Sequence, residues 1–66
     1  MRLTINGEMR DVAPVSTLSD LIAQLSLDTR KVAIEQNLEI VPRSLHAATR
    51  VAEGDRIEIV HFIGGG

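Results

Sequence analysis

The sequence predicts an α+β domain, with a mixed sheet of four to five strands and one main helix packed across one face. Three observations predict this class. Runs rich in β-branched residues lie toward both ends of the chain, one stretch between them has the apolar spacing of a helix, and turn-forming dipeptides separate the runs. A chain of 66 residues is long enough for a single domain.

The first predicted element is a β-hairpin. Residues 1–5 alternate apolar and polar side chains, which is typical of a strand with one face in a core. Asn6-Gly7 follows, and this dipeptide readily supplies the two positive φ angles of a type I′ turn. Pro14 lacks a backbone N–H and therefore helps to end the second strand.

A helix is predicted next. Ser16 and Thr17 offer side-chain oxygens to the free N–H groups of a helix start, and Asp20 stands where it can return the capping bond. One apolar stripe then follows the spacing i, i+3, i+4, i+7: Leu18, Leu21, Ile22 and Leu25. We therefore expect a helix of roughly three turns with this stripe facing the sheet.

Two short strands are predicted after the helix, the first around Val32 and Ile34 and the second around Ile40 and Val41. Pro42 closes the second strand. Residues 44–51 carry too few apolar repeats for a full helix, so we expect a short 3₁₀ turn or an irregular connection there.

The last predicted strand runs from Arg56 to Phe62, after a turn at Gly54-Asp55, and its side chains alternate between two faces. The resulting order of strands and helix is the β-grasp plan, in which the last strand is central and the residues after it project from the sheet. We accordingly expect a β-grasp domain over residues 1–63 and a flexible C-terminal glycine tail over residues 64–66.

Composition excludes several classes of function. The chain has no cysteine, and His46 and His61 are too far apart for a spaced metal motif, so we expect neither a bound metal nor a bound cofactor. The basic residues are scattered among nine carboxylates at a net charge of −2, which disfavours nucleic-acid binding. No apolar run is long enough for a membrane helix and no secretory pattern is present, so we expect a cytoplasmic protein without membrane contact.

The three final glycines suggest a chemical role for the carboxyl end of the chain. Glycines have no Cβ, so Gly64, Gly65 and Gly66 fit a channel barely wider than a peptide backbone. A terminal carboxylate is an anion at neutral pH and resists nucleophiles until it is activated, for example by transfer to an adenylyl group. No residue of this chain supplies that chemistry, so a partner enzyme is required. The alternative is a frayed end without function.

Three stretches resemble the ThiS family, the small ubiquitin-like β-grasp sulfur carriers of thiamine (thiazole) biosynthesis: the hairpin around "NGE", "VAIEQNLEIVPRS" and "EGDRIEIVHFIGGG". The resemblance implies that a ThiF-like adenylating enzyme uses ATP to adenylate the carboxylate of Gly66. Sulfur from a cysteine desulfurase or a persulfide relay then converts it to a thiocarboxylate, which donates sulfur to a ThiG-like thiazole synthase. It further implies that Gly66 carries the sulfur, that Gly64 and Gly65 thread the partner's active site, and that the chain itself is not an enzyme.

The chain departs from the family pattern at two turns. The family usually has Asn-Gly between the third and fourth strands and a glycine after the helix, where this chain has Asn37-Leu38 and Ser26. If Leu38 or Ser26 adopts a positive φ, the strain is on the order of 1 kcal/mol.

Val60 and Phe62 are the candidate docking residues, because they lie near the tail on the strand face opposite Ile57 and Ile59. An exposed apolar patch there would dock on the activating enzyme, whereas the alternative is that Phe62 fills the end of the core. Two rival functions use the same plan: a sulfur carrier of the molybdopterin-synthase type, and a ubiquitin-like protein modifier or interaction module.

Overall fold

The computed structural model describes residues 1–62, and positions 63–66 lie outside the described residues. The elements follow one another in the order predicted, with one additional 3₁₀ turn (η1) after the helix. They are β1 (Arg2–Ile5), β2 (Glu8–Asp11), α1 (Leu18–Gln24), η1 (Thr29–Lys31), β3 (Val32–Gln36), β4 (Glu39–Val41), η2 (Arg43–Leu45) and β5 (Arg56–His61).

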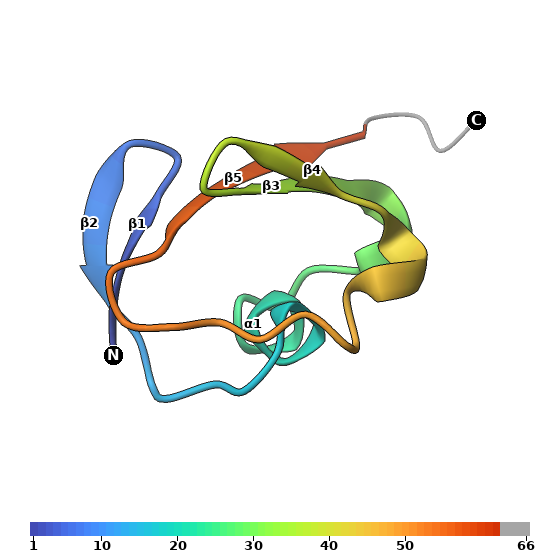
Figure 1. Cartoon of the computed structure of the whole chain (residues 1–66). Helices are drawn as coiled ribbons and strands as arrows, with labels where there is room; N and C mark the ends of the chain where they lie inside the picture. Colours follow the sequence, from blue (N-terminus) through green and yellow to red (C-terminus); the bar gives the residue numbers. More distant parts are fainter. Residues whose placement is uncertain (63–66) are drawn as a thin grey trace.

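The described strands form one five-stranded sheet in the order β2-β1-β5-β3-β4. β5 pairs parallel with β1 and antiparallel with β3, so the last strand is central, as predicted. Helix α1 lies across one face of this sheet, and among residues 1–62 no helix covers the other face (Figure 1). The arrangement confirms the expected α+β class, with a mixed sheet and one main helix.

The core lies between α1 and the sheet. Its buried apolar residues come from β1, α1, β3, β5 and the connection before β5: Leu3, Ile5, Leu18, Leu21, Ile22, Val32, Ile34, Val51 and Ile57. The strand alternation and the helix stripe predicted nearly all of these positions. Val51 is the exception: it is buried, but it lies in the irregular connection before β5, where the sequence pattern predicted no core residue.

Helix α1 begins at the predicted capping box. The hydroxyl of Thr17 accepts the N–H of Asp20 at 3.2 Å, and the carboxylate of Asp20 accepts the N–H of Thr17 at 3.1 Å. The helix has seven residues, about two turns, and is therefore shorter than the predicted three. Leu25 is its C-cap rather than a further helical residue, and it still packs against the core.

Ser26 explains why the helix ends early. Its φ is +61°, and its N–H donates to the carbonyl of Ala23 at 3.0 Å, while the N–H of Leu27 donates to the carbonyl of Ile22 at 3.0 Å. This pair of bonds is a Schellman motif, which usually has glycine at the position of Ser26. The chain thus forms this helix end with a residue that is strained there.

Both hairpin turns have the positive φ angles of a type I′ turn. The first turn has φ of +51° at Asn6 and +81° at Gly7, as predicted. The second has +52° at Asn37 and +73° at Leu38, so Leu38 does occupy the strained conformation considered from the sequence. Within the described part of the chain, no helix has the length and apolar character needed to cross a membrane.

Candidate functional site

The candidate site is the end of β5 from which the glycine tail continues. The predicted sulfur-carrying residue Gly66 and the predicted threading residues Gly64 and Gly65 lie outside the described residues, as does the expected boundary between domain and tail. The described part of the site is therefore the strand that precedes these glycines and the surface around it.

β5 is paired with β3 from Gln36↔Ile57 to Val32↔His61, that is, up to the last residue of the strand. The pairing continues one residue past the strand, where the N–H of Phe62 donates to the carbonyl of Lys31 at 2.8 Å. A central strand that is hydrogen-bonded to a neighbouring strand, as β5 is to β3, is among the most rigid parts of a small domain. The last described residue before position 63 is thus held by the sheet.

Two turn asparagines also hold β5, one from each neighbouring hairpin. The Asn6 side chain accepts the N–H of Ile59 at 2.7 Å and donates to the carbonyl of the same residue at 3.3 Å. Asn37 accepts the N–H of Arg56 through its side chain at 3.0 Å, and its own N–H donates to the carbonyl of Arg56 at 2.8 Å. The sequence indicated a turn at each of these asparagines, but this second role of the two side chains was missed.

Val60 and Phe62 lie on the sheet face away from α1, with 59% and 53% of their surfaces exposed. Phe62 therefore does not fill the end of the core. Ala33 is paired with Val60, and Ile40 on the neighbouring strand is 78% exposed, so the four residues form one apolar surface. We call Ala33, Ile40, Val60 and Phe62 the outer patch.

The two histidines differ sharply in environment. His46 is buried, and its Nδ1 lies 2.9 Å from the hydroxyl of Thr29 while its Nε2 lies 3.1 Å from the carbonyl of Val41. Because a carbonyl only accepts, Nε2 must donate to Val41, which leaves Nδ1 to accept from Thr29. His46 is thus a structural link between η1, η2 and β4, and its burial gives it no access to a substrate. His61 is exposed.

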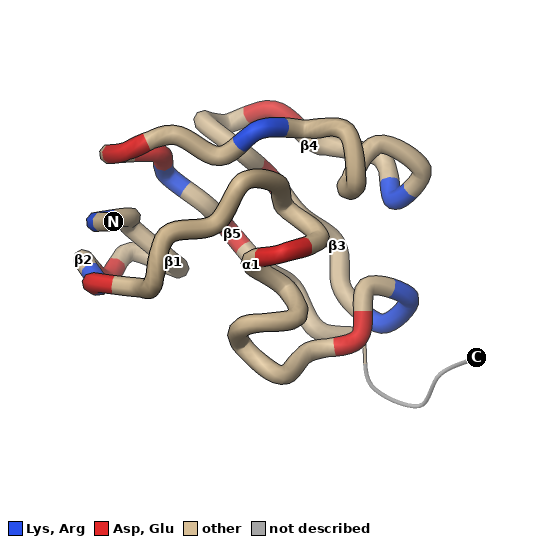
Figure 2. Tube along the Cα trace, turned by 90° about the horizontal axis from the view of Figure 1, so that it is seen from below, with Lys and Arg blue, Asp and Glu red and all other residues tan. Residues whose placement is uncertain are grey.

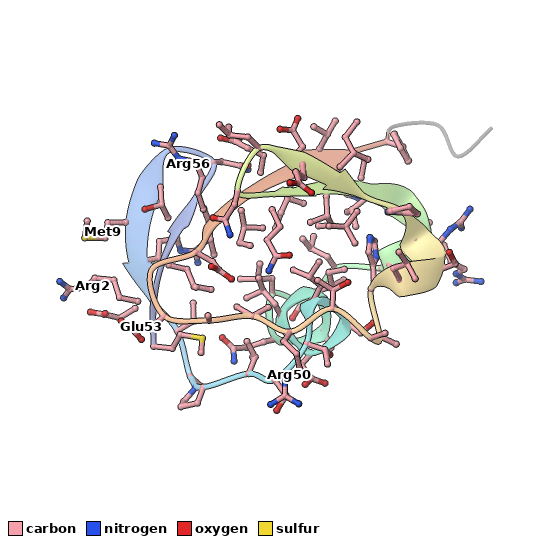
Figure 3. All side chains as sticks on the ribbon, viewed as in Figure 1. Arg2, Met9, Arg50, Glu53 and Arg56 are labelled. Carbon is pink, nitrogen blue, oxygen red and sulfur yellow. The ribbon has the colours of Figure 1, made fainter. Side chains whose placement is uncertain are left out.

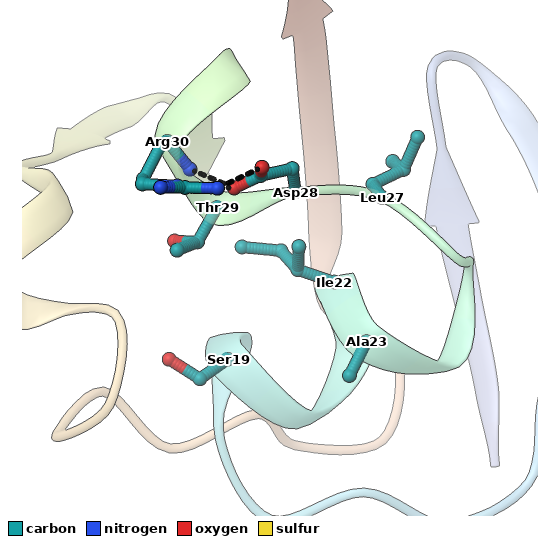
Figure 4. Close-up of a pocket in the computed structure, with 7 residues that line it drawn as sticks. All are labelled: Ser19, Ile22, Ala23, Leu27, Asp28, Thr29 and Arg30. Carbon is teal, nitrogen blue, oxygen red and sulfur yellow. Dashed lines mark hydrogen bonds and ion pairs between the residues drawn. The ribbon is translucent and has the colours of Figure 1, made fainter.

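Charged residues of both signs are distributed around the molecule (Figure 2). Arg30 pairs with Asp28 at 2.9 Å, and this hydrogen-bonded guanidinium lowers the pKa of the Asp28 carboxyl to about 2. The pair lies at the rim of an open depression of about 450 Å³ between α1 and η1 (Figure 4). The Asp28 carboxylate is already bound to the Arg30 guanidinium. Within residues 1–62, no three acidic, histidine or cysteine side chains lie close enough together to hold a metal ion.

Comparison with known proteins decides the family. The family model described as "ThiS family" matches residues 3–66, nearly the whole chain. The chain belongs to the ThiS family. Its fold is accordingly the ThiS type of β-grasp: the solved structure of the thiamine biosynthesis protein ThiS from Geobacter metallireducens matches with a TM-score of 0.83 at 33% identity, covering 100% of both chains.

Relatives of this chain include a sulfur carrier protein and much longer thiazole synthases. The sulfur carrier protein ThiS of Bacillus subtilis is 35% identical over 97% of this chain and 98% of its own length. A thiazole synthase of Paramagnetospirillum magneticum is 53% identical over 100% of this chain, and one of Magnetococcus marinus is 41% identical. The chain spans only 20% of the length of either thiazole synthase.

Proposed function

We propose that this chain is a sulfur carrier whose Gly66 carboxylate is adenylated and then converted to a thiocarboxylate that donates sulfur for thiazole formation. The observation that carries the proposal is membership of the ThiS family over residues 3–66, together with a near full-length likeness to a sulfur carrier of Bacillus subtilis. The proposal requires the carboxyl group of Gly66 to be free in the working protein. We place this work in the cytoplasm, where ATP is available.

The chemistry proceeds in two stages. An oxygen of the Gly66 carboxylate attacks the α-phosphorus of ATP and pyrophosphate leaves, so the carboxylate becomes an acyl adenylate. The terminal sulfur of a persulfide then attacks the carbonyl carbon and AMP leaves with that oxygen. A thiol reductant splits the resulting S–S bond, which leaves a thiocarboxylate on Gly66 and a disulfide on the donor side.

The chain's own part in this chemistry is to present the carboxylate. It contains no cysteine, so the sulfur nucleophile has to come from another protein. A ThiF-like enzyme supplies the adenylation site with its ATP, and a cysteine desulfurase or a persulfide relay supplies the sulfur. The chain is a protein substrate of these enzymes rather than an enzyme.

A ThiG-like thiazole synthase is the proposed acceptor of the sulfur. Two thiazole synthases contain a segment similar to the whole of this chain, at 53% and 41% identity. A carrier segment and a synthase within one polypeptide are held at a high effective concentration, which favours direct transfer between them. This supports the same transfer between separate chains.

We assign docking on the adenylating enzyme to the outer patch. Val60 and Phe62 are more than half exposed and stand at the base of the tail, where an enzyme acting on Gly66 has to approach. Exposed apolar surface of this kind usually marks an interaction site. Val60→Asp should raise the KM of adenylation about tenfold or more with little change in kcat, because it removes apolar contact and adds an unpaired charge.

Transfer assays test the proposed function. The chain is loaded by the adenylating enzyme with ATP and a persulfide donor and is then offered to a thiazole synthase or to a pterin-forming subunit. Sulfur transfer to the thiazole synthase supports the proposal, and transfer only to the pterin-forming subunit supports the rival carrier. A variant that lacks Gly65 and Gly66 is the matched control, and it should remain unloaded while its domain stays folded.

A further inference from the structure

One edge of β5 is left open beyond the point where β1 ends. In an antiparallel pair, alternate residues direct their N–H and C=O groups toward the partner strand. The hydrogen bond from the Phe62 N–H to the Lys31 carbonyl shows which residues of β5 face β3. The backbone groups of Val60 and Phe62 point toward β3. Those of Ile57, Ile59 and His61 point toward the β1 side. Figure 1 shows β5 running on past the β1–β2 hairpin in this region.

The hydrogen bonds on the β1 side stop one residue short of the strand end. The carbonyl of Ile57 accepts the N–H of Asn6 at 2.9 Å, and both backbone groups of Ile59 bond to the Asn6 side chain. His61 is the next residue whose backbone groups point toward the β1 side, and within residues 1–62 neither its N–H nor its C=O has a hydrogen-bond partner. The Asn6 amide thus makes the last hydrogen bonds on this edge of β5, and the backbone N–H and C=O of His61 beyond it are unpaired within residues 1–62. We call this unpaired N–H and C=O of His61 the vacant rung.

A groove of about 340 Å³ lies beside this vacant rung. Ile5, Leu25, Leu27 and Ile59 supply its apolar lining, and Arg10 and His61 supply polar groups. Arg10 is exposed on β2, and among the described residues it has no ion pair. We call this feature the β5-edge groove. It is distinct from the outer patch, because Ile5 and Ile59 point to the α1 side of the sheet.

We propose that the β5-edge groove binds an extended segment of the adenylating enzyme, which adds as a strand beside His61. Unpaired N–H and C=O groups on a strand edge can form hydrogen bonds with the backbone of an added strand. Every second side chain of the added strand then points toward the groove. The groove fits an apolar side chain, and Arg10 fits a neighbouring Asp or Glu of the same segment.

The choice of occupant rests on the proposed function. If Gly66 is the residue that is adenylated, four residues follow Phe62 and reach at most about 14 Å in extended form. The adenylating enzyme must therefore come within this distance of the end of β5, where the vacant rung lies. Strand pairing at His61 would fix the direction in which the tail leaves the domain.

Amide hydrogen exchange of the isotope-labelled full chain tests the proposal. In the free chain the N–H of His61 should exchange at least about tenfold faster than that of Val60, which is bonded within the sheet. Excess adenylating enzyme should slow exchange at His61 about tenfold or more. Unchanged exchange at His61 in a saturated complex would overturn the proposal. Protection by thiazole synthase alone, or protection that rises with concentration of the free chain, would also overturn it.

Charge reversal supplies a second measurement. Arg10→Glu should weaken binding of the adenylating enzyme about tenfold, because like charges would then face each other across the groove. Arg56→Glu is the matched control: Arg56 is exposed at the start of β5, the end opposite His61, and belongs to neither the β5-edge groove nor the outer patch, so it should matter much less (Figure 3). Equal effects of the two reversals, at unchanged melting temperature, would overturn the assignment.

The two proposals fail separately. If Gly66 is adenylated normally in Arg10→Glu and His61 remains unprotected in the complex, the groove assignment is wrong and the carrier function stands. If His61 is protected but Gly66 is never adenylated by an active enzyme, the carrier function is wrong and strand pairing stands.

Discussion

Replacing Leu38 with glycine should stabilise the domain. Leu38 has a φ of +73° in the turn between β3 and β4, and its side chain is 73% exposed. An L-residue in this conformation is strained by about 1–2 kcal/mol, and glycine is not. The greater freedom of glycine in the unfolded chain offsets roughly 0.5–1 kcal/mol of that gain. The exposed leucine loses little packing, so the net gain in unfolding free energy is about 0.5–1 kcal/mol.

Thermal and urea unfolding measure this gain. For a domain of this size, it corresponds to a rise in melting temperature of about 2–8 °C. The urea midpoint should rise with an unchanged slope, because the surface exposed on unfolding hardly changes.

Leu38→Ala is the matched control for Leu38→Gly. It removes the same exposed apolar atoms but keeps a Cβ at positive φ, so it should leave the melting temperature nearly unchanged. If alanine stabilises as much as glycine, backbone strain is not the cause. A lower melting temperature for Leu38→Gly would refute the reasoning outright, because it would mean that the leucine side chain stabilises the turn.

Three further changes test the same physical picture. Ser26→Gly should raise the unfolding free energy by about 0.5–1 kcal/mol in urea melts and should add to the Leu38→Gly gain, because the two turns share no partner. Thr17→Ala should lower it by about 1 kcal/mol in the same melts, because it removes the side-chain bond to the N–H of Asp20. The Asp28 carboxyl has a pKa lowered from 3.8 to about 2, so its contribution to stability should be present above pH 4 and lost as the pH falls through 2. Asp28→Asn should abolish that part of the pH dependence, and an NMR titration of Asp28 with a midpoint near its ordinary value would contradict the assignment.

Local patterns predicted the parts of the fold that local chemistry decides. Asn6-Gly7 made a hairpin because few other dipeptides adopt two positive φ angles, and Thr17 with Asp20 capped the helix as their spacing required. Alternation in the last strand placed Val60 on the exposed face, so that part of the candidate site was predictable as well. Periodicity overestimated the length of the helix. The apolar stripe continues to Leu25, and it does not show that Ser26 ends the helix by adopting a positive φ.

Contacts between distant parts of the chain were not predictable in this way. The bonds between Asn6 and Ile59 join residues 53 positions apart, and no local pattern indicates them. The burial of Val51 and the links made by His46 likewise depend on where the connection before β5 crosses the fold. The roles expected of Gly64, Gly65 and Gly66 come from the family resemblance, and they remain predictions.

Intact-protein mass spectrometry tests the carrier function most directly. The chain is incubated with the adenylating enzyme, ATP and a persulfide donor, and its mass is compared with that of a sample without ATP. We expect one oxygen to be exchanged for sulfur, with the change located by fragmentation at Gly66. An unchanged mass in the presence of an enzyme proven active on another carrier, or a Gly66 carboxyl group blocked by further chain in the protein isolated from cells, would contradict the account.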